Sequence, residues 1–277
     1  MKGKLYPCLW FDGKAKEAAT YYSSVFENSK IISENPIVVF FELDGMQFMG
    51  LNGGPQFKIN PSVSFFVFAD SAEDIEKKWK HLSADGSIMM PLNKYPWNEK
   101  YGWCQDKFGV NWQLMMSPVA EQKIVPSFMF TQGQSGKAEE AINFYTSIFK
   151  NSEVQMISRY EKGEQDVEGN IKHARFTLNG QAFAAMESSG PHGFTFNEGI
   201  SLVVPCDNQE EIDYYWNKLT EGGKESQCGW LKDKFGVSWQ IVPAILGKLM
   251  GDPAKNKRVM DIVMNSVKFN IEELENA

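Results

Sequence analysis

Residues 102–116 of the chain read GWCQDKFGVNWQLMM, and residues 229–243 read GWLKDKFGVSWQIVP. Nine of these fifteen positions are identical, so one segment occurs twice in the same chain. Two further pairs of segments match at nine of sixteen and nine of twenty-seven positions: 14–29 with 137–152, and 60–86 with 197–223. Because the matches keep the same order in each half, the sequence indicates a tandem duplication.

The duplication predicts how the 277 residues divide into domains. We expect a first domain at 1–118, a linker at 119–124, a second domain at 125–245 and a C-terminal helical tail at 246–277. Pro118 favours an interruption before the linker, because proline cannot continue regular structure. Within the tail, residues 253–268 are expected to form a helix with Asp252 as its N-cap and Pro253 at the first position.

Hydrophobic periodicity alternates between that of a helix and that of a strand within each half. Residues 14–27 predict an amphipathic helix whose apolar face consists of Ala18, Tyr21, Tyr22, Val25 and Phe26. The later segments predict strands at 37–43 and 46–51, a strand at 63–69, a helix at 72–84, and strands near 102–106 and at 110–115. The Asp44-Gly45 step and its counterpart Asn179-Gly180 favour two-residue hairpin turns. Each half therefore predicts the order βαβββ twice, which is an α+β fold.

Composition excludes several classes of protein. The chain is 43% hydrophobic and 23% charged, which disfavours disorder, and no apolar run reaches the ~20 residues of a membrane span. A net charge of −7 disfavours nucleic acid and anionic membrane as partners. The N-terminal residues lack the apolar stretch of a signal peptide, and none of the four cysteines forms a C-x-x-C pair. We therefore expect reduced thiols and a cytoplasmic location.

Three motifs carry a resemblance to a known family. They are A-x-x-Y-Y-x-x-V-F at residues 18–26, FELDG at residues 41–45 with LNGGP at residues 51–55, and CGWLKDKFGVSWQ at residues 228–240. Together with the repeated βαβββ order, they resemble the vicinal oxygen chelate superfamily of glyoxalases, bleomycin-resistance proteins and extradiol dioxygenases. Within it, the chain is similar to the PhnB-like branch, which is labelled 3-demethylubiquinone-9 3-methyltransferase-like.

The resemblance implies that paired βαβββ modules form an open, curved, eight-stranded sheet with helices on the outer face and a concave cavity inside. The label of the branch also implies methyl transfer, which the residues do not support. A nucleotide-type cofactor needs a glycine-rich turn between a strand and a helix. Here Gly53-Gly54 follows a hairpin and Gly222-Gly223 ends a helix, so we expect no cofactor.

Metalloenzymes of this superfamily place His, Gln or Glu ligands at four strand positions in each domain. Carried over by pattern, these positions fall on Pro7, about Gly50, Ser64 and Gln113 in the first half, and on Pro126, about Ala185, Ser201 and Gln240 in the second. Divalent metals prefer carboxylates and imidazoles, which both sets lack. We therefore expect no metal ion. His173 alternates with Arg175 on a predicted strand and could face a cavity, but for each of the three histidines a surface or ordinary hydrogen-bonded position is the favoured interpretation.

Strand alternation predicts which side chains line the concave face. The candidate ligand-binding residues are Phe48, Asn52, Ser64, Phe66, Gln113, Arg159, Phe183, Glu187, Ser201 and Gln240. Aromatic walls with a few amide and hydroxyl groups suit a neutral aromatic or polycyclic ligand. The alternative is that the aromatic side chains simply fill a closed interior.

Glu187 is the best single candidate for a catalytic residue, because burial would raise its pKa and make it a general base. A surface position at a strand end is the competing interpretation. Three hypotheses remain: a metal-free protein that binds a small organic molecule, an enzyme of the lyase, isomerase or dioxygenase type that uses Glu187 or a metal, and a catalytically inert structural pseudo-dimer. The expected partner is a small-molecule ligand. The two repeats form an intrachain pseudo-dimer, and a homodimer is left open.

Overall fold

The computed structural model describes residues 4–277 of the chain. They divide into two compact units, one formed by residues 7–200 and the other by residues 201–277 with those before Pro7. Both units contain the same module, which is a strand, a helix and three further strands. Four such modules follow one another, which confirms the βαβββ order predicted from the repeat.

The first module contains β1 (Tyr6–Phe11), α1 (Ala15–Val25), β2 (Ser29–Glu34), β3 (Val38–Leu43) and β4 (Met46–Asn52). The second contains β5 (Val63–Ala69), α2 (Ala72–Leu82), β6 (Ser87–Tyr95), β7 (Asn98–Gln105) and β8 (Asn111–Met116). The third contains β9 (Ile124–Thr131), the 3-10 helix η1 (Gln132–Gln134), α3 (Ala138–Ile148), β10 (Val154–Arg159), β11 (Ile171–Leu178) and β12 (Gln181–Ser188). The fourth contains β13 (Ile200–Cys206), α4 (Gln209–Thr220), β14 (Lys224–Glu225), β15 (Trp230–Lys232) and β16 (Ser238–Pro243).

The second and third modules share one eight-stranded sheet in the order β10-β11-β12-β9-β5-β8-β7-β6. This sheet therefore joins strands from both halves of the sequence repeat. At its centre β5 and β9 are antiparallel, with Ser64 opposite Ser127, while β5–β8 and β9–β12 are parallel pairs. The sheet is mixed and open, because β10 and β6 are its two edges. Strands β1 to β4 pair in the order β1-β4-β3-β2, and β13 to β16 in the order β13-β16-β15-β14.

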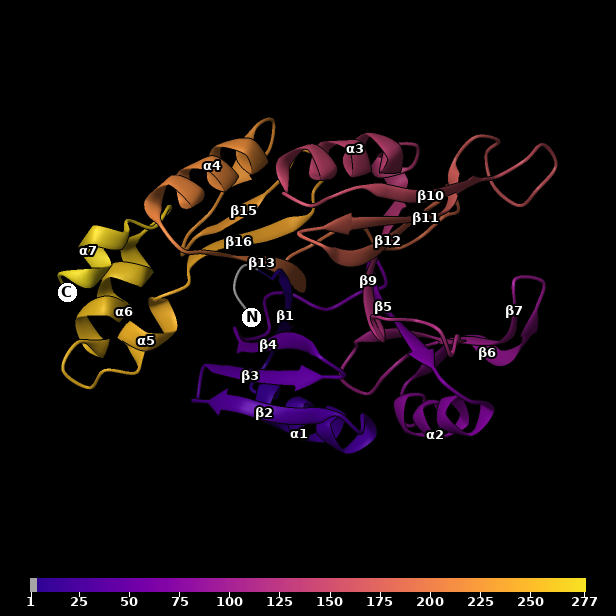
Figure 1. Cartoon of the computed structure of the whole chain (residues 1–277), viewed down its shortest axis with the longest axis horizontal. Helices are drawn as coiled ribbons and strands as arrows, with labels where there is room; N and C mark the ends of the chain where they lie inside the picture. Colours follow the sequence, from indigo (N-terminus) through magenta and orange to yellow (C-terminus); the bar gives the residue numbers. More distant parts are fainter. Residues whose placement is uncertain (1–3) are drawn as a thin grey trace. The chain divides into compact units, whose positions relative to one another are not determined.

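Helices α2 and α3 lie on the outer side of the eight-stranded sheet (Figure 1). Gly102 permits the close approach of α2, because a Cβ atom there would lie 2.6 Å from the Trp79 ring. On the side of α3, the ring of Phe128 packs against Tyr145 and stacks with Phe183. Since neighbouring residues of a strand point to opposite faces, these contacts fix which side chains point away from the helices.

Several local predictions are confirmed. Asp44-Gly45 and Asn179-Gly180 form the turns of two hairpins, with all four residues at positive φ between 45° and 83°. All four cysteines are free, three of them buried and Cys228 half-buried. Strands β2 at Ser29–Glu34 and β6 at Ser87–Tyr95 were not among the strands located in the sequence. Across residues 4–277, no helix combines the length and apolarity that crossing a membrane requires.

The predicted helix at 253–268 is too long. Three short helices occupy the C-terminal segment: α5 (Leu246–Met250), α6 (Asn256–Asn265) and α7 (Ile271–Glu275). Asp252 is not an N-cap, because the cap position of α6 is Lys255. The Asp252 carboxylate instead accepts a hydrogen bond from the backbone N–H of Ala254 at 2.9 Å, so Pro253 lies in a turn before the helix. Within α6 one side chain, Val259, is fully buried.

Candidate functional site

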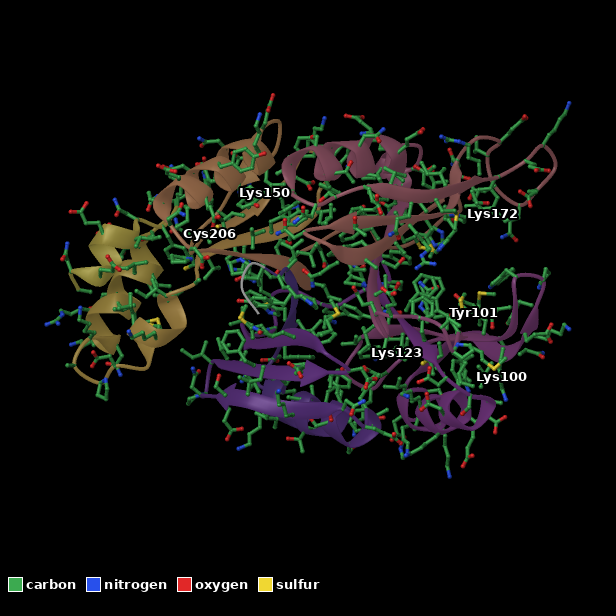
Figure 2. All side chains as sticks on the ribbon, in the orientation of Figure 1. Lys100, Tyr101, Lys123, Lys150, Lys172 and Cys206 are labelled. Atoms are coloured by element: carbon green, nitrogen blue, oxygen red, sulfur yellow. The ribbon has the colours of Figure 1, made fainter. Side chains whose placement is uncertain are left out.

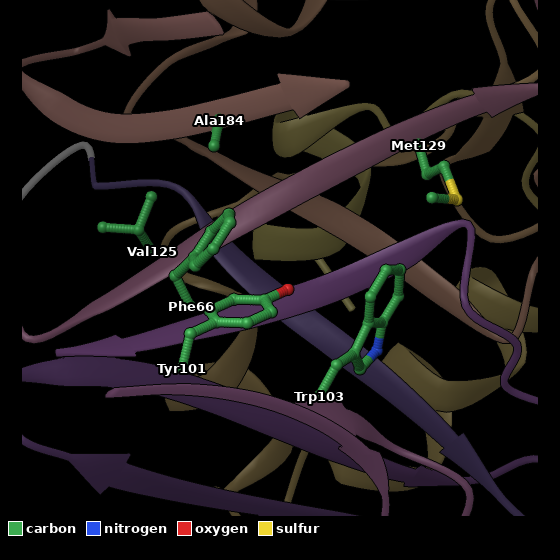
Figure 3. Close-up of a cluster of buried hydrophobic side chains, with 6 residues drawn as sticks. All are labelled: Phe66, Tyr101, Trp103, Val125, Met129 and Ala184. Carbon is green, nitrogen blue, oxygen red and sulfur yellow. The ribbon is translucent and has the colours of Figure 1, made fainter. Parts of the chain in front are cut away.

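The face of the eight-stranded sheet that points away from α2 and α3, which we call the inner face, carries a cluster of buried apolar side chains. Its buried members come from four strands of this sheet, β5, β7, β9 and β12, and are Phe66, Tyr101, Trp103, Val125, Met129 and Ala184 (Figure 3). Half-buried side chains border the cluster: Phe68, Met90, Tyr95, Met115, Ala182, Met186 and Phe194. Figure 2 shows the alternation on β7, where Lys100 points toward α2 and Tyr101 to the opposite side.

Three predicted site residues, Ser64, Phe66 and Gln113, lie together on the inner face. The Tyr101 hydroxyl donates a hydrogen bond to Gln113 Oε1 at 2.6 Å, and Gln113 Nε2 donates to Ser64 Oγ at 2.8 Å. Burial raises the pKa of Tyr101 far above the ordinary value, so its hydroxyl stays protonated. Tyr101, Gln113 and Ser64 therefore form a buried and uncharged polar chain.

The inner-face placement predicted for Phe48, Asn52, Phe183 and Glu187 is wrong. Phe48 stacks on Phe41 in the core beneath α1, and Phe183 stacks on Phe128 beneath α3. Asn52 Oδ1 accepts a hydrogen bond from the backbone N–H of Ala15, the first residue of α1, at 2.9 Å. All four side chains therefore face helices.

Both alternating faces of β4 and β12 are apolar, so alternation alone does not tell which face a helix covers. A stronger signal was Gly50, which lies between Phe48 and Asn52 on the same face of β4. A Cβ atom at Gly50 would lie 3.1 Å from the Cβ of Ala15, so the absence of a side chain there allows α1 to pack closely.

Glu187 is buried and holds the beginning of α3 in place. Its Oε1 accepts from the backbone N–H of Ala138 at 2.7 Å, and its Oε2 accepts from the backbone N–H of Ile171 at 2.5 Å. A carboxylate at a helix N-terminus satisfies amides that have no partner within the helix. The surface position considered for Glu187 is therefore wrong, and both of its oxygens are engaged in structural hydrogen bonds.

The remaining predicted residues lie elsewhere. Arg159 is exposed at the end of β10, where it forms an ion pair with Glu139 at 2.6 Å and donates to the carbonyl of Gly169 at 3.1 Å. Ser201 and Gln240 belong to the fourth module. There Gln240 Nε2 donates to Ser201 Oγ at 2.9 Å, as Gln113 does to Ser64. The repeat thus preserves this amide–hydroxyl pair in two modules.

His173 points to the inner face, the possibility that the sequence left open, and not to the surface position that it favoured. Its ring meets Phe66 edge to face, with the ring centroids 5.7 Å apart. Burial, with a further contribution from the charge of Arg175, lowers the pKa of His173 to about 4. The imidazole is therefore neutral at physiological pH, and the buried part of the inner face carries no ionised group.

Three polar atoms on the inner face are buried without a hydrogen-bonding partner in the part of the chain that the structure describes. They are the indole Nε1 of Trp103, the Oγ of Ser127 and the Oδ1 of Asn111, which shares a face of β8 with Gln113. Sequence analysis did not single out Trp103, Tyr101 or Met129. The signal for the two aromatic residues was their alternation with Gly102, because a glycine on the outer side places both neighbours on the inner side.

The inner face does not fit a divalent metal ion. Ser64 and Gln113 occupy two of the positions where metalloenzymes of the superfamily place metal ligands. Both side chains are neutral, and they already form a hydrogen bond with each other. Among the described residues, no group of three or more His, Cys, Asp or Glu side chains is arranged to hold a metal ion. The glycine pairs have structural roles as well, since a Cβ atom at Gly53 would collide with the Trp10 ring and Gly222 follows α4 at φ +72°.

A charged pocket of about 360 Å³ lies near the N-terminus of α2. Its lining includes Asp44, Asp74 and Lys78, and the buried Lys78 ammonium forms an ion pair with Asp74. Burial raises the pKa of Asp44, and the charge of Lys78 opposes this effect. The side chains at this pocket pair with one another, so their charges are largely compensated within the protein.

Several solved structures are similar to this chain. The PhnB protein from Bacillus cereus is 35% identical over 40% of this chain and 98% of its own, with a TM-score of 0.39. A Staphylococcus aureus protein is 32% identical over 41% of this chain and 95% of its own, with a TM-score of 0.19. Glyoxalase I from Zea mays is 12% identical over 89% of this chain and 96% of its own, with a TM-score of 0.60, and so shows the same fold. Among curated proteins, none matches the chain.

The model of one family matches twice in succession, at residues 3–115 and 122–242, and thus matches each half of the duplication once. The family is described as 3-demethylubiquinone-9 3-methyltransferase. The two matches span most of the chain, and together with the glyoxalase-type fold they place the chain in the 3-demethylubiquinone-9 3-methyltransferase (PhnB-like) family.

Proposed function

We propose that the protein binds a small, uncharged organic molecule with aromatic or polycyclic rings on the inner face, without a metal ion. The observation that carries this proposal is the convergence of Phe66, Tyr101, Trp103 and Met129 on one face of the sheet. Aromatic rings offer large flat contact areas, and thioethers adapt to the shape of a ligand. The proposal is limited to binding and includes no reaction.

The same side chains could instead serve only to fill the interior. The border of the cluster favours binding, because Phe68, Met90, Met115, Met186 and Phe194 are only partly buried. A flat ligand could displace flexible methionine side chains from the aromatic rings of the cluster. It would gain contacts with these rings and leave the hydrogen bonds from Tyr101 to Gln113 and from Gln113 to Ser64 intact. Adaptable methionine-rich surfaces are typical of sites that accept varied apolar ligands.

Methyl transfer, which the family description names, is not included in the proposal, because neither glycine pair forms a cofactor-binding turn. A lyase or isomerase that uses Glu187 is not included either. Glu187 is buried and both of its oxygens accept backbone hydrogen bonds, so protonating this carboxylate would weaken the bonds that hold the beginning of α3 and of β11.

Thermal shift with naphthalene-sized aromatic probes tests the proposal. We expect at least one uncharged probe to raise the unfolding temperature of the wild-type protein and to lose this effect in Phe66→Leu. The matched control is Phe183→Leu, which makes the same change at a buried phenylalanine on the helix-covered face. A stabilisation that survives in Phe66→Leu, or the failure of every probe in a broad aromatic set, would overturn the proposal.

The setting proposed for this activity is the reducing cytoplasm, with neither nucleic acid nor membrane as partner. Free Cys8, Cys104 and Cys206, together with the net charge of −7, support it. Thiol titration of freshly prepared, denatured protein is expected to find all four thiols without a reductant. Recovery in a membrane or periplasmic fraction of the source cells would contradict this location.

A further inference from the structure

We propose that the ligand of the inner face carries a hydrogen-bond acceptor, an uncharged carbonyl or ether oxygen attached to its ring system, and that the indole N–H of Trp103 donates to it. This inference rests on the proposed function and specifies the chemical class of the ligand. It starts from one atom, the Nε1 of Trp103, which is buried without a partner among residues 4–277.

The unpaired indole of Trp103 is an exception among the buried tryptophans that the structure describes. The other three donate at hydrogen-bond distance: Trp112 to Asp106 at 2.8 Å, Trp216 to Glu225 at 2.9 Å and Trp239 to Asp233 at 2.8 Å. The half-buried Trp10 also donates, to the Gly54 carbonyl at 2.7 Å. Trp103 is only 8% exposed, so water does not replace the missing acceptor at its surface. A buried donor without a partner destabilises a fold, and such groups in native proteins call for an explanation.

The protein's own polar groups on the inner face leave the Trp103 indole without a partner. Tyr101 lies on the same face of β7, and its hydroxyl donates to Gln113, the residue directly opposite Trp103 on β8. The Gln113 amide nitrogen in turn donates to Ser64. Two buried acceptors on this face, Asn111 Oδ1 and Ser127 Oγ, have no hydrogen-bonding partner among the described residues, and neither of them accepts from the indole.

The surroundings of Trp103 also decide the charge of the acceptor. The buried residues of the inner face include no cation, and His173 is neutral because its pKa is lowered to about 4. A carboxylate or phosphate bound there would be desolvated without a counter-charge, which is costly. A ketone, aldehyde, quinone-type carbonyl or aryl ether would satisfy the indole without that cost. Aromatic ketones are the simplest representatives of this class.

Two isosteric probes test the assignment: 2-acetylnaphthalene, which has a carbonyl, and 2-isopropenylnaphthalene, in which a CH₂ group replaces that oxygen. Affinities are measured by equilibrium dialysis for wild type, Trp103→Phe and Trp97→Phe. Trp97 is the matched control, because it lies in the same β6–β7 hairpin but is 53% exposed, so water can serve its indole.

We expect the ratio of ketone to alkene affinity to fall about tenfold in Trp103→Phe and to stay unchanged in Trp97→Phe, since one hydrogen bond accounts for such a factor. In wild-type protein with ¹⁵N-labelled tryptophan, the Trp103 Nε1–H resonance should move downfield with the ketone and not with the alkene. This second measurement requires no variant to fold.

The outcomes separate this inference from the function on which it rests. If both probes bind in a Phe66-dependent way but the affinity ratio is the same in Trp103→Phe, the acceptor assignment is wrong while binding at the inner face stands. An equal loss of the ratio in Trp97→Phe would also overturn it. If neither probe binds, or if Phe66→Leu has no effect on either, both the function and this inference fail.

Discussion

The rings of Phe66 and His173 meet edge to face at 87°, with their centroids 5.7 Å apart, although β12 and β9 lie between their strands in the sheet. Neighbouring strands are spaced about 4.8 Å apart, so in a flat sheet residues three strands apart would be separated by roughly 14 Å. The contact therefore shows that the sheet is curved. The curvature brings β11 over β5, so the inner face is concave.

The pH dependence of stability should reveal His173. Its folded-state pKa is lowered to about 4 from the ordinary value of 6.5, so between these values the unfolded chain binds more protons than the folded one. Stability is thus expected to fall as the pH drops from 6.5 toward 4, by up to about 3 kcal/mol. Urea unfolding of wild type and His173→Gln at pH 7, 5.5 and 4.5 measures this loss. Identical losses in both proteins would contradict the assignment.

Glu187 should prove to be a structural carboxylate. Replacing it with Ala removes two charge-assisted hydrogen bonds and is expected to lower the free energy of unfolding by about 3 kcal/mol. Its counterpart Asn52 makes one uncharged hydrogen bond to α1, so Asn52→Ala should cost about 1 kcal/mol. Urea unfolding measures both. A Glu187→Ala protein as stable as the wild type would contradict the capping role.

Asp106 forms hydrogen bonds with two aromatic side chains in the core of the unit formed by residues 7–200. Its carboxylate accepts from Trp112 Nε1 and Tyr22 Oη, each at 2.8 Å, and from two backbone amides. Burial raises its pKa, and these hydrogen bonds oppose the effect. Asp106→Ala leaves every donor unpaired and should cost more than about 3 kcal/mol, against about 1 kcal/mol for Tyr22→Phe. Equal losses in chemical denaturation would show that the carboxylate does not join this network.

Gln113 and Tyr101 should be energetically coupled. In a double-mutant cycle, Tyr101→Phe should cost about 1 kcal/mol in the wild-type background and much less once Gln113→Leu has removed its acceptor. Tyr101→Phe combined with Asn52→Ala, which lies beneath α1, is the control and should be additive. A cycle with no coupling between Tyr101 and Gln113 would argue against their hydrogen bond in solution.

Metal analysis should find no stoichiometric ion in protein purified without chelators, and EDTA should leave the unfolding temperature unchanged. The physical reason is that Ser64 and Gln113 are weak neutral ligands that already bond to each other. About one tightly held transition-metal ion per repeat would contradict this expectation.

Much of the site could be predicted from strand alternation, but not all of it. Ser64, Phe66 and Gln113 were placed correctly because the apolar Val110, Trp112 and Leu114 clearly mark the helix-covered face of the last strand. Phe48 and Phe183 were misplaced because their strands are apolar on both faces. Tyr101 and Trp103 were missed because the alternation around Gly102, which places both on the inner face of β7, was not used.

The sequence by itself determined the duplication, the four βαβββ modules and the positions of most helices and strands, because these follow from local periodicity, turn residues and identity between the halves. Only the tertiary structure decided that the second and third modules share one sheet across the repeat boundary, and which face of each strand the helices cover. Both depend on pairing between segments far apart in the chain, such as Ser64 with Ser127, and on the close approach of helices at Gly50 and Gly102. Period-two alternation constrains such contacts but does not specify them.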